Sequence, residues 1–139
     1  MGEERYYAAY GSNLNRAEMK KRCPGAIPVG TGYIHGYTLL FCRYLTIEPD
    51  EKKEVPVGIW QISAEDERAL DEYEAYPSLY RKEYLELEID GRRLMVLIYR
   101  MNEVGKSHPS EEYFQTCLTG YQDFGLNTSY LYEALRISE

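Results

Sequence analysis

The run Tyr10-Gly11-Ser12-Asn13-Leu14 joins a buried-strand pattern to a helix pattern near the N-terminus. Glycine permits a positive φ at this junction, and the first N–H groups of a helix have no partner within the helix. They lie at the positive end of the helix dipole, so such a turn can hold a carboxylate or a developing oxyanion. The same residues are also typical of an ordinary Ser or Asn helix cap after a glycine turn. Local pattern alone leaves both interpretations open.

A second candidate is Glu74, in the helix-like segment Leu70–Tyr76. At ~100° per residue, Glu74 lies at the edge of the apolar arc of this helix, next to tyrosines. Partial desolvation raises the pKa of such a carboxyl towards neutrality, where it suits proton transfer. The alternative is a half-exposed glutamate or one hydrogen-bonded to a tyrosine hydroxyl. Tyr80 is placed to bring a hydroxyl to the same region, although most buried tyrosines are structural.

Glycines, prolines and capping residues divide the rest of the chain into short elements that must position these groups. We expect strands over Tyr6–Tyr10, Val55–Ile62, Leu85–Ile89 and Leu94–Tyr99, two strands bent at glycines between Ile27 and Tyr44, a charged loop over Ile47–Glu54, and helices over Leu14–Cys23, from Ser63 to about Tyr76, from Ser110 to Gly125 and from Asn127 or Thr128 onward. This order predicts an α+β fold. We expect one domain, residues 1–139, with a small mixed, mostly antiparallel β-barrel and flanking helices.

Charge excludes two classes of partner. The 139 residues include 16 Lys and Arg against 23 Asp and Glu, a net charge of −7. This excess of acid argues against nucleic acid and against an anionic membrane surface. The basic triplet Lys20-Lys21-Arg22 ends a predicted helix, where cations complement the dipole and are expected to face water.

The cysteines and the hydropathy of the sequence indicate the cellular compartment and whether a metal site is expected. The 3 cysteines are odd in number and widely spaced, which is typical neither of a disulfide framework nor of a zinc site. We see no apolar run near the ~20 residues that a membrane span needs, and no secretory signal. We therefore expect a cytoplasmic protein without a metal. The composition has 15 Tyr against 3 Phe, so polar hydroxyls must find partners inside the core.

Two segments together resemble a known family. The run Tyr7-Ala8-Ala9-Tyr10-Gly11-Ser12-Asn13-Leu14 resembles the N-terminal signature of the gamma-glutamylcyclotransferase family, and Leu70-Asp71-Glu72-Tyr73-Glu74 is similar to its second motif, which ends in the catalytic glutamate. Tyr80 fits, and Pro109–Tyr113, Cys117 and Gly125-Leu126 resemble the family's terminal helices. One departure is Ala75, where members commonly have glycine.

The resemblance implies a small mixed barrel with flanking helices and an enzyme without metal or cofactor. Its substrate would be a small gamma-glutamyl amide, whose own α-amine attacks the γ-carbonyl and releases 5-oxoproline. Glu74 would be the general acid/base, and the substrate-binding residues would be Tyr7, Tyr10, Gly11, Ser12, Asn13, Leu14 and Tyr80. Alternatives are the same chemistry on a gamma-glutamylamine or another gamma-glutamyl-protected metabolite, and a non-catalytic small-molecule-binding domain on this fold. The protein would be a monomer or a homodimer.

Overall fold

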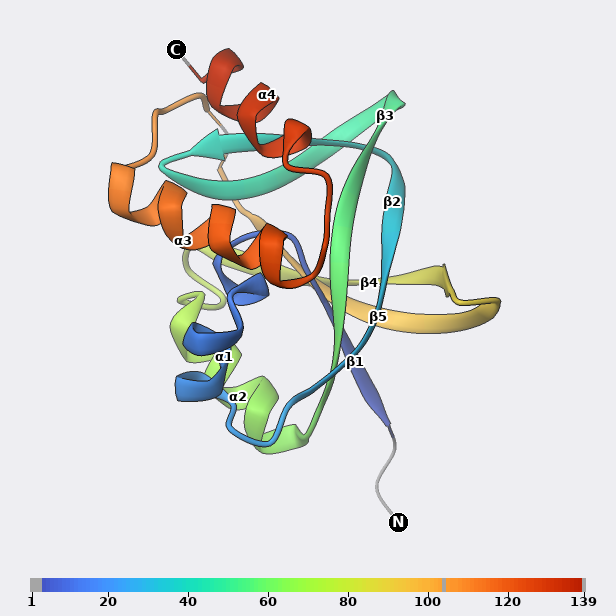
Figure 1. Cartoon of the computed structure of the whole chain (residues 1–139). Coiled ribbons are helices and arrows are strands. Elements are labelled where there is room, and N and C mark those ends of the chain that lie inside the picture. Colours follow the sequence, from blue (N-terminus) through green and yellow to red (C-terminus); the bar gives the residue numbers. More distant parts are fainter. Residues whose placement is uncertain (1–3, 104, 139) are drawn as a thin grey trace.

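The computed structural model describes residues 4–103 and 105–138. These residues form, in chain order, β1 (Arg5–Ala9), the 3-10 turn η1 (Ser12–Leu14), α1 (Arg16–Arg22), β2 (Ile27–Cys42), β3 (Tyr44–Ile62), α2 (Ala64–Tyr73), β4 (Tyr80–Ile89), β5 (Arg92–Met101), α3 (Glu111–Asp123) and α4 (Ser129–Ile137). In Figure 1 the helices gather on the left, and the β4–β5 hairpin extends to the right.

The strands form one five-stranded sheet in the order β2-β3-β1-β5-β4. All neighbours are antiparallel except β1 and β5, which pair in parallel. The short strand β1 lies in the middle, where Tyr7, Ala8 and Ala9 are buried. A fully covered central position suits a strand with almost no polar side chains. The predicted fold class, α+β with a mostly antiparallel sheet, is confirmed.

The sheet curls until its two edge strands approach each other. Ile89 of β4 packs so closely on Gly30 and Gly32 of β2 that a Cβ at either glycine would lie 2.8 or 2.6 Å from its methyl groups. In the described part of the chain no ladder of hydrogen bonds joins β2 to β4. The predicted barrel is therefore a strongly curved sheet whose edges meet through side chains.

The central hairpin differs from our expectation. Where two bent strands and a charged loop were predicted, β2 and β3 run as two long strands joined at Arg43, whose φ is +68°. The register shifts between Pro28 and Gly30 and again between His35 and Tyr37. Gly30 and Gly36 therefore lie at bulges, which is one of the alternatives (bulges, bends or turns) that the sequence indicated for the glycines here. The predicted loop Ile47–Glu54 pairs with β2 as part of β3. Its charges project from an edge hairpin and are compatible with a strand.

The helix boundaries are close to the predictions. Asn15 caps α1, and its side-chain oxygen accepts from the Glu18 N–H at 3.0 Å. The predicted capping box at Ser63 opens α2, and Gly125, with a φ of +68°, follows α3 as predicted. However, α2 ends at Tyr73 instead of about Tyr76, and Ala75 beyond it has a φ of +52°. The left-handed conformation at Ala75 stops the helix there.

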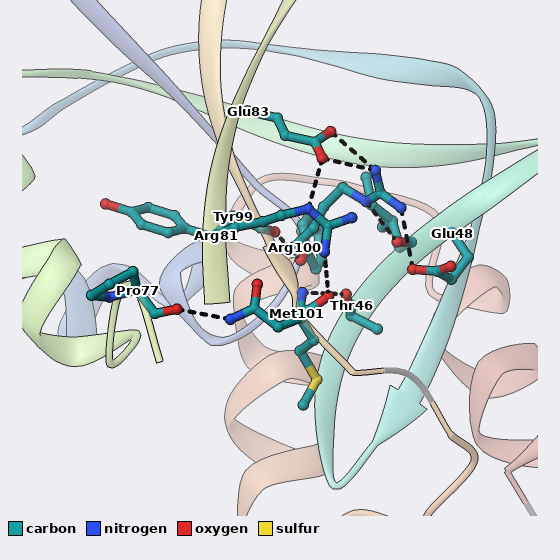
Figure 2. A network of polar contacts seen from close by, with 11 residues as sticks. Thr46, Glu48, Pro77, Arg81, Glu83, Tyr99, Arg100 and Met101 are labelled. Carbon is teal, nitrogen blue, oxygen red and sulfur yellow. Dashed lines mark hydrogen bonds and ion pairs between the residues drawn. The ribbon is translucent and has the colours of Figure 1, made fainter. Parts of the chain in front are cut away.

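Figure 2 shows a polar network that ties three strands together at one end of the sheet. Arg100 of β5 is buried and donates to Glu83 of β4 at 3.0 Å, and to Glu48 of β3 at 3.2 Å. The Met101 N–H donates to Thr46 Oγ1 at 2.9 Å. Successive side chains of a strand point to opposite faces, so the neighbours of Thr46 and Arg100, namely Leu45 and Tyr99, face the other way.

Candidate active site

A cavity of about 280 Å³ lies on that other face. The turn η1 and residues of β1, β3 and β5 enclose it, together with the end of α2, the start of β4 and the first turn of α3. The residues that line it are Tyr7, Tyr10, Gly11, Ser12, Asn13, Tyr44, Leu45, Tyr73, Glu74, Leu79, Tyr80, Tyr99 and Tyr113.

The cavity brings together residues that are far apart in sequence. Glu74 lines it, together with six of the seven positions expected to bind substrate: Tyr7, Tyr10, Gly11, Ser12, Asn13 and Tyr80. The seventh, Leu14, is fully buried behind the turn, where it packs against Gly58 and Gly120. The structure therefore places Leu14 in the support of the turn rather than in the cavity wall.

Glu74 is the residue directly after α2, not a residue within the helix as the sequence predicted. Its N–H donates to the Leu70 carbonyl at 2.8 Å, so the backbone is fixed as the chain leaves the helix. Burial raises the pKa of Glu74 to about 7, and the positive charge of Arg22 opposes this rise. Near neutral pH this carboxyl can therefore both accept and release a proton.

The side chain of Asn13 connects the turn to Glu74. Its Nδ2 donates to the Tyr7 hydroxyl at 3.0 Å and makes a longer contact of 3.4 Å with Glu74 Oε1. Its backbone carbonyl accepts from the Trp60 indole at 3.0 Å. Ser12 is fixed separately, with 2.8 Å between its hydroxyl and that of Tyr73. The turn is thus anchored to β1, β3 and α2 at once.

The backbone of this turn leaves donors free. The N–H groups of Leu14 and Asn15 donate to the carbonyls of Gly11 and Ser12. Among the described residues, no acceptor pairs with the N–H groups of Gly11, Ser12 and Asn13. Gly11 has a φ of −131°, so the positive φ expected there is wrong. A Cβ at this position would lie 3.3 Å from the Tyr113 hydroxyl, so a larger residue would require a small shift of that side chain.

The tyrosine hydroxyls around the cavity are tethered and uncharged. Tyr80 donates to the Leu45 carbonyl at 2.8 Å, Tyr10 donates to the Tyr99 carbonyl, and Tyr99 donates to Asp71 at 2.6 Å. Burial raises the pKa of Tyr10, Tyr80 and Tyr99 above the ordinary tyrosine value. Among the described residues that line the cavity, Glu74 is therefore the carboxyl that gains or loses its charge near neutral pH.

Sequence reasoning missed several residues of this region. Tyr44, Tyr99 and Tyr113 come from segments that meet the turn only in the folded chain, and the excess of tyrosine was their one general signal. Arg22 was expected to face water with Lys20 and Lys21. Those two lysines are exposed, but only 15% of the Arg22 side chain is, and it turns back towards Asn13.

Fold and cavity define a class of protein: a small α+β domain with one half-buried carboxyl beside a glycine turn. The family can be named as well. The sequence profile of the gamma-glutamyl cyclotransferase, AIG2-like family matches residues 7–116, and the chain belongs to this family. The resemblance seen in the sequence is thereby confirmed.

Solved structures show the same fold. A protein described as a gamma-glutamyl cyclotransferase superposes with a TM-score of 0.85 at 22% identity, covering 95% of this chain and 86% of the other. An uncharacterized protein from Homo sapiens gives a TM-score of 0.83 at 22% identity over 96% and 87% of the two chains. YkqA from Bacillus subtilis gives 0.81 at 20% identity, covering 99% of this chain and 55% of that one. A comparison with curated proteins found no match.

The described residues offer neither a metal site nor a membrane-spanning helix. No group of three or more His, Cys, Asp or Glu side chains in residues 4–103 and 105–138 is arranged to hold a metal ion. None of the helices in the same ranges is both long and apolar enough to cross a membrane.

Proposed function

We propose that this protein is a cyclotransferase that releases 5-oxoproline from a small gamma-glutamyl amide. The observation that carries the proposal is the position of Glu74, a half-buried carboxyl with a pKa of about 7 beside free backbone N–H groups. The substrate supplies its own nucleophile, so the reaction needs no serine or cysteine nucleophile. Family membership supports the same reaction.

The first step forms the ring. The Glu74 carboxylate takes a proton from the substrate's α-ammonium group, and the freed amine attacks the γ-carbonyl carbon of the same glutamyl residue. The carbonyl π electrons move to its oxygen and give a tetrahedral oxyanion. Holding the chain folded converts this attack into a well-oriented intramolecular reaction, which carries a large rate advantage. The cavity volume of about 280 Å³ accommodates a folded glutamyl group.

The second step breaks the amide bond. The oxyanion collapses, the bond from the γ-carbon to the leaving nitrogen breaks, and that nitrogen takes a proton from the Glu74 carboxylic acid. The ionised Glu74 then takes the second proton from the ring nitrogen and passes it to the released amine. The products are therefore 5-oxoproline and a protonated amine, and Glu74 is again ionised. A carboxyl with a pKa of about 7 suits both transfers, because either protonation state is readily reached at neutral pH.

The turn supplies the electrostatic part of the mechanism. The N–H groups of Gly11, Ser12 and Asn13 are fixed donors for the substrate's carboxylate or its developing oxyanion. Loss of one such donor typically costs ~3 kcal/mol of transition-state stabilisation. We assign Tyr7, Tyr10 and Tyr80 to the walls that enclose the glutamyl group and exclude water.

One feature of the lining favours an uncharged leaving group. Among the described residues that line the cavity there is no Lys, Arg or His to pair with the carboxylate of a departing amino acid. The exposed residues nearby are Tyr44, Tyr73 and Leu79, which offer aromatic and apolar surface. This favours a gamma-glutamylamine over a gamma-glutamyl amino acid as the preferred substrate.

The test is a panel of gamma-glutamyl amino acids and gamma-glutamylamines, with 5-oxoproline and the free amine both quantified. We expect release from at least one amine substrate, and a loss of about 100- to 10,000-fold in kcat/KM in Glu74→Gln. Glu72→Gln is the matched control, because Glu72 lies two residues earlier on the exposed side of α2. It should keep full activity.

Two outcomes would contradict the proposal. Full activity in Glu74→Gln would remove the assigned acid/base. Binding of panel members without any 5-oxoproline would instead identify the protein as a non-catalytic binding domain.

A further inference from the structure

We propose that Arg22 is a positioning residue for Glu74, which acts through the side-chain amide of Asn13. The inference rests on the proposed function, because it concerns the same carboxyl. It goes further in assigning a role to a residue of α1 that does not line the cavity.

The hydrogen-bond pattern fixes which way the Asn13 amide points. Arg22 Nη1 lies 2.7 Å from Asn13 Oδ1. A guanidinium can only donate, so the atom of Asn13 that meets it must be the carbonyl oxygen. The amide nitrogen is therefore turned to the other side, towards Tyr7 and Glu74. Without Arg22, nothing in this contact would prevent the amide from rotating and presenting its oxygen to the carboxylate.

Arg22 is itself held in place. Its guanidinium carbon lies 3.5 Å from the centre of the Tyr73 ring, and its Nη2 lies 3.2 Å from Glu18 Oε1. The aromatic ring covers one face of the planar group, and the ion pair one helical turn away holds its edge. Tyr73 directly precedes Glu74, so Arg22 contacts both neighbours of the carboxyl, Asn13 through a hydrogen bond and Tyr73 through its ring.

Arg22 also has an electrostatic effect on Glu74, in addition to orienting Asn13. Groups that sense Glu74 electrostatically come from every side: Tyr7 and Tyr10 at the end of β1, Tyr73 of α2, Tyr80 of β4, Tyr113 and Cys117 of α3, and Arg22 of α1. Burial raises the pKa of each of these tyrosines and of Cys117, so they are neutral near pH 7. Arg22 is the cation in this set, and it favours the ionised form of Glu74.

The direction in which the pKa of Glu74 moves distinguishes the loss of Arg22's charge from a general opening of the cavity to water. Removing Arg22 takes away a positive charge, so the pKa of Glu74 should rise above its present value of about 7. A variant that merely opened the cavity to water would relieve desolvation and move the pKa in the opposite direction.

The experiment titrates Glu74 directly, in the protein without substrate. Its carboxyl carbon is followed by NMR in protein labelled with ¹³C-glutamate and is identified by its disappearance in Glu74→Gln. We expect Arg22→Met to shift the titration midpoint upward by on the order of one pH unit. Arg22→Lys, which restores the charge, should return the midpoint close to that of the wild type.

The matched control is Arg16→Met. Arg16 lies on the same helix and its guanidinium also covers an aromatic ring, Phe124, at 5.0 Å, but it makes no contact with Asn13 or Glu74. It should leave the midpoint unchanged. Should Arg22→Met fold poorly, Arg22→Gln removes the charge while keeping an N–H donor, and the same upward shift is expected.

Turnover supplies an independent readout. At pH 7 a one-unit rise in pKa lowers the ionised fraction of Glu74 by roughly fivefold, so kcat should fall by at least that factor with little change in KM. Above about pH 9, Glu74 is ionised in both proteins, so the loss of kcat caused by its protonation should vanish. Any loss of kcat that remains there reports on the orientation of Asn13.

A midpoint that is unchanged or lower in Arg22→Met overturns the inference. The titration needs no substrate, so a failure of the proposed reaction is seen separately, as absence of 5-oxoproline from every panel member.

Discussion

Glu74 is an ionisable carboxyl in a position where its ionised form is poorly stabilised. It is a carboxyl in a poorly solvated cavity, and no ion pair of Glu74 is found within the described residues. Its hydrogen-bond contact with Asn13 is long, at 3.4 Å. A group held in this way disfavours its own ionised form and thereby destabilises the folded state at neutral and alkaline pH.

Glu74→Gln should therefore stabilise the protein in a pH-dependent manner. The folded pKa of about 7 lies above the ordinary value of 4.5, so the favourable contribution of the protonated carboxyl is fully present below about pH 4.5 and is lost as the pH rises through 7. Compared with wild type, the variant should be similar in stability at pH 5 and more stable by on the order of 2 kcal/mol at pH 8. Urea unfolding at both pH values measures the difference. An equal gap at the two pH values would contradict the desolvation of this carboxyl.

Local signals in the sequence singled out Glu74 and the glycine turn but left two interpretations open, and the resemblance to the family then assigned their roles. A capping box, an apolar arc and a glycine between a strand and a helix can each be recognised within about ten residues. Arg22 could not be recognised in this way. It follows two lysines that do face water, and its inward direction depends on where η1 places Asn13 after folding. Tyr99 and Tyr113 likewise reach the cavity only through the register of β5 and the packing of α3.

At the scale of elements, the end of α2 sets the position of the carboxyl. Ala75 adopts a φ of +52°, and its N–H donates to the Glu72 carbonyl at 3.1 Å. The Tyr76 N–H then donates to the Asp71 carbonyl at 2.9 Å. These bonds satisfy the last carbonyls of the helix and turn the chain sharply. The glycine common in the family at this position is explained by the same φ, which glycine adopts without strain.

We expect Ala75→Gly to stabilise the protein by about 0.5–1 kcal/mol, because it relieves the left-handed strain at the helix end. The matched control is Ala17→Gly on the exposed side of α1, which should instead destabilise by about 1 kcal/mol. Chemical denaturation of both variants measures whether the free energy of unfolding rises in Ala75→Gly and falls in Ala17→Gly. A loss of stability in Ala75→Gly would mean that this residue does not occupy the left-handed region.

Strands were harder to predict than helices. The β2–β3 hairpin was divided into shorter pieces because its glycines and its charged segment look like turn and loop signals. In the structure the glycines occupy bulges or lie under Ile89, and the charged residues pair across an edge. Whether a glycine marks a turn or a close approach depends on what packs against it, and that is decided by residues more than fifty positions away.

For the molecule as a whole, the network around Arg100 joins three strands beside the cavity. Burial opposes the ionisation of Glu83, but hydrogen bonds from Arg100 and Arg81 outweigh it and lower the pKa of Glu83. The pairing therefore stabilises the fold above the ordinary glutamate pKa, and this contribution is lost as the pH falls through the lowered value. Its pH dependence is opposite in sign to that of Glu74.

Arg100→Met should destabilise the protein by about 2 kcal/mol at pH 7, because it removes the donor of the Ile47 carbonyl and leaves Glu83 with Arg81 as its remaining partner. The difference from wild type should shrink in acid, as Glu83 becomes protonated in both proteins. Arg93→Met is the control on the same strand: its pair with Glu86 is exposed, and its loss should change stability by less than about 0.5 kcal/mol. Equal effects of the two substitutions in thermal or urea unfolding would contradict a structural role for the Arg100 network.

The α+β class followed from the order of the elements, which needs only local signals. The order of strands in the sheet did not follow, since it depends on pairings between distant segments. The central strand β1 pairs with residues 58–62 on one side and with residues 96 and 97 on the other.

This strand order has a consequence for biosynthesis. One edge of β1 can pair with β3 once residue 62 has been synthesised, but its other edge stays open until translation has passed residue 101 and β5 has emerged. Nascent chains stalled before that point leave an open edge on a strand that is buried in the finished fold, and an open strand edge is prone to aggregation.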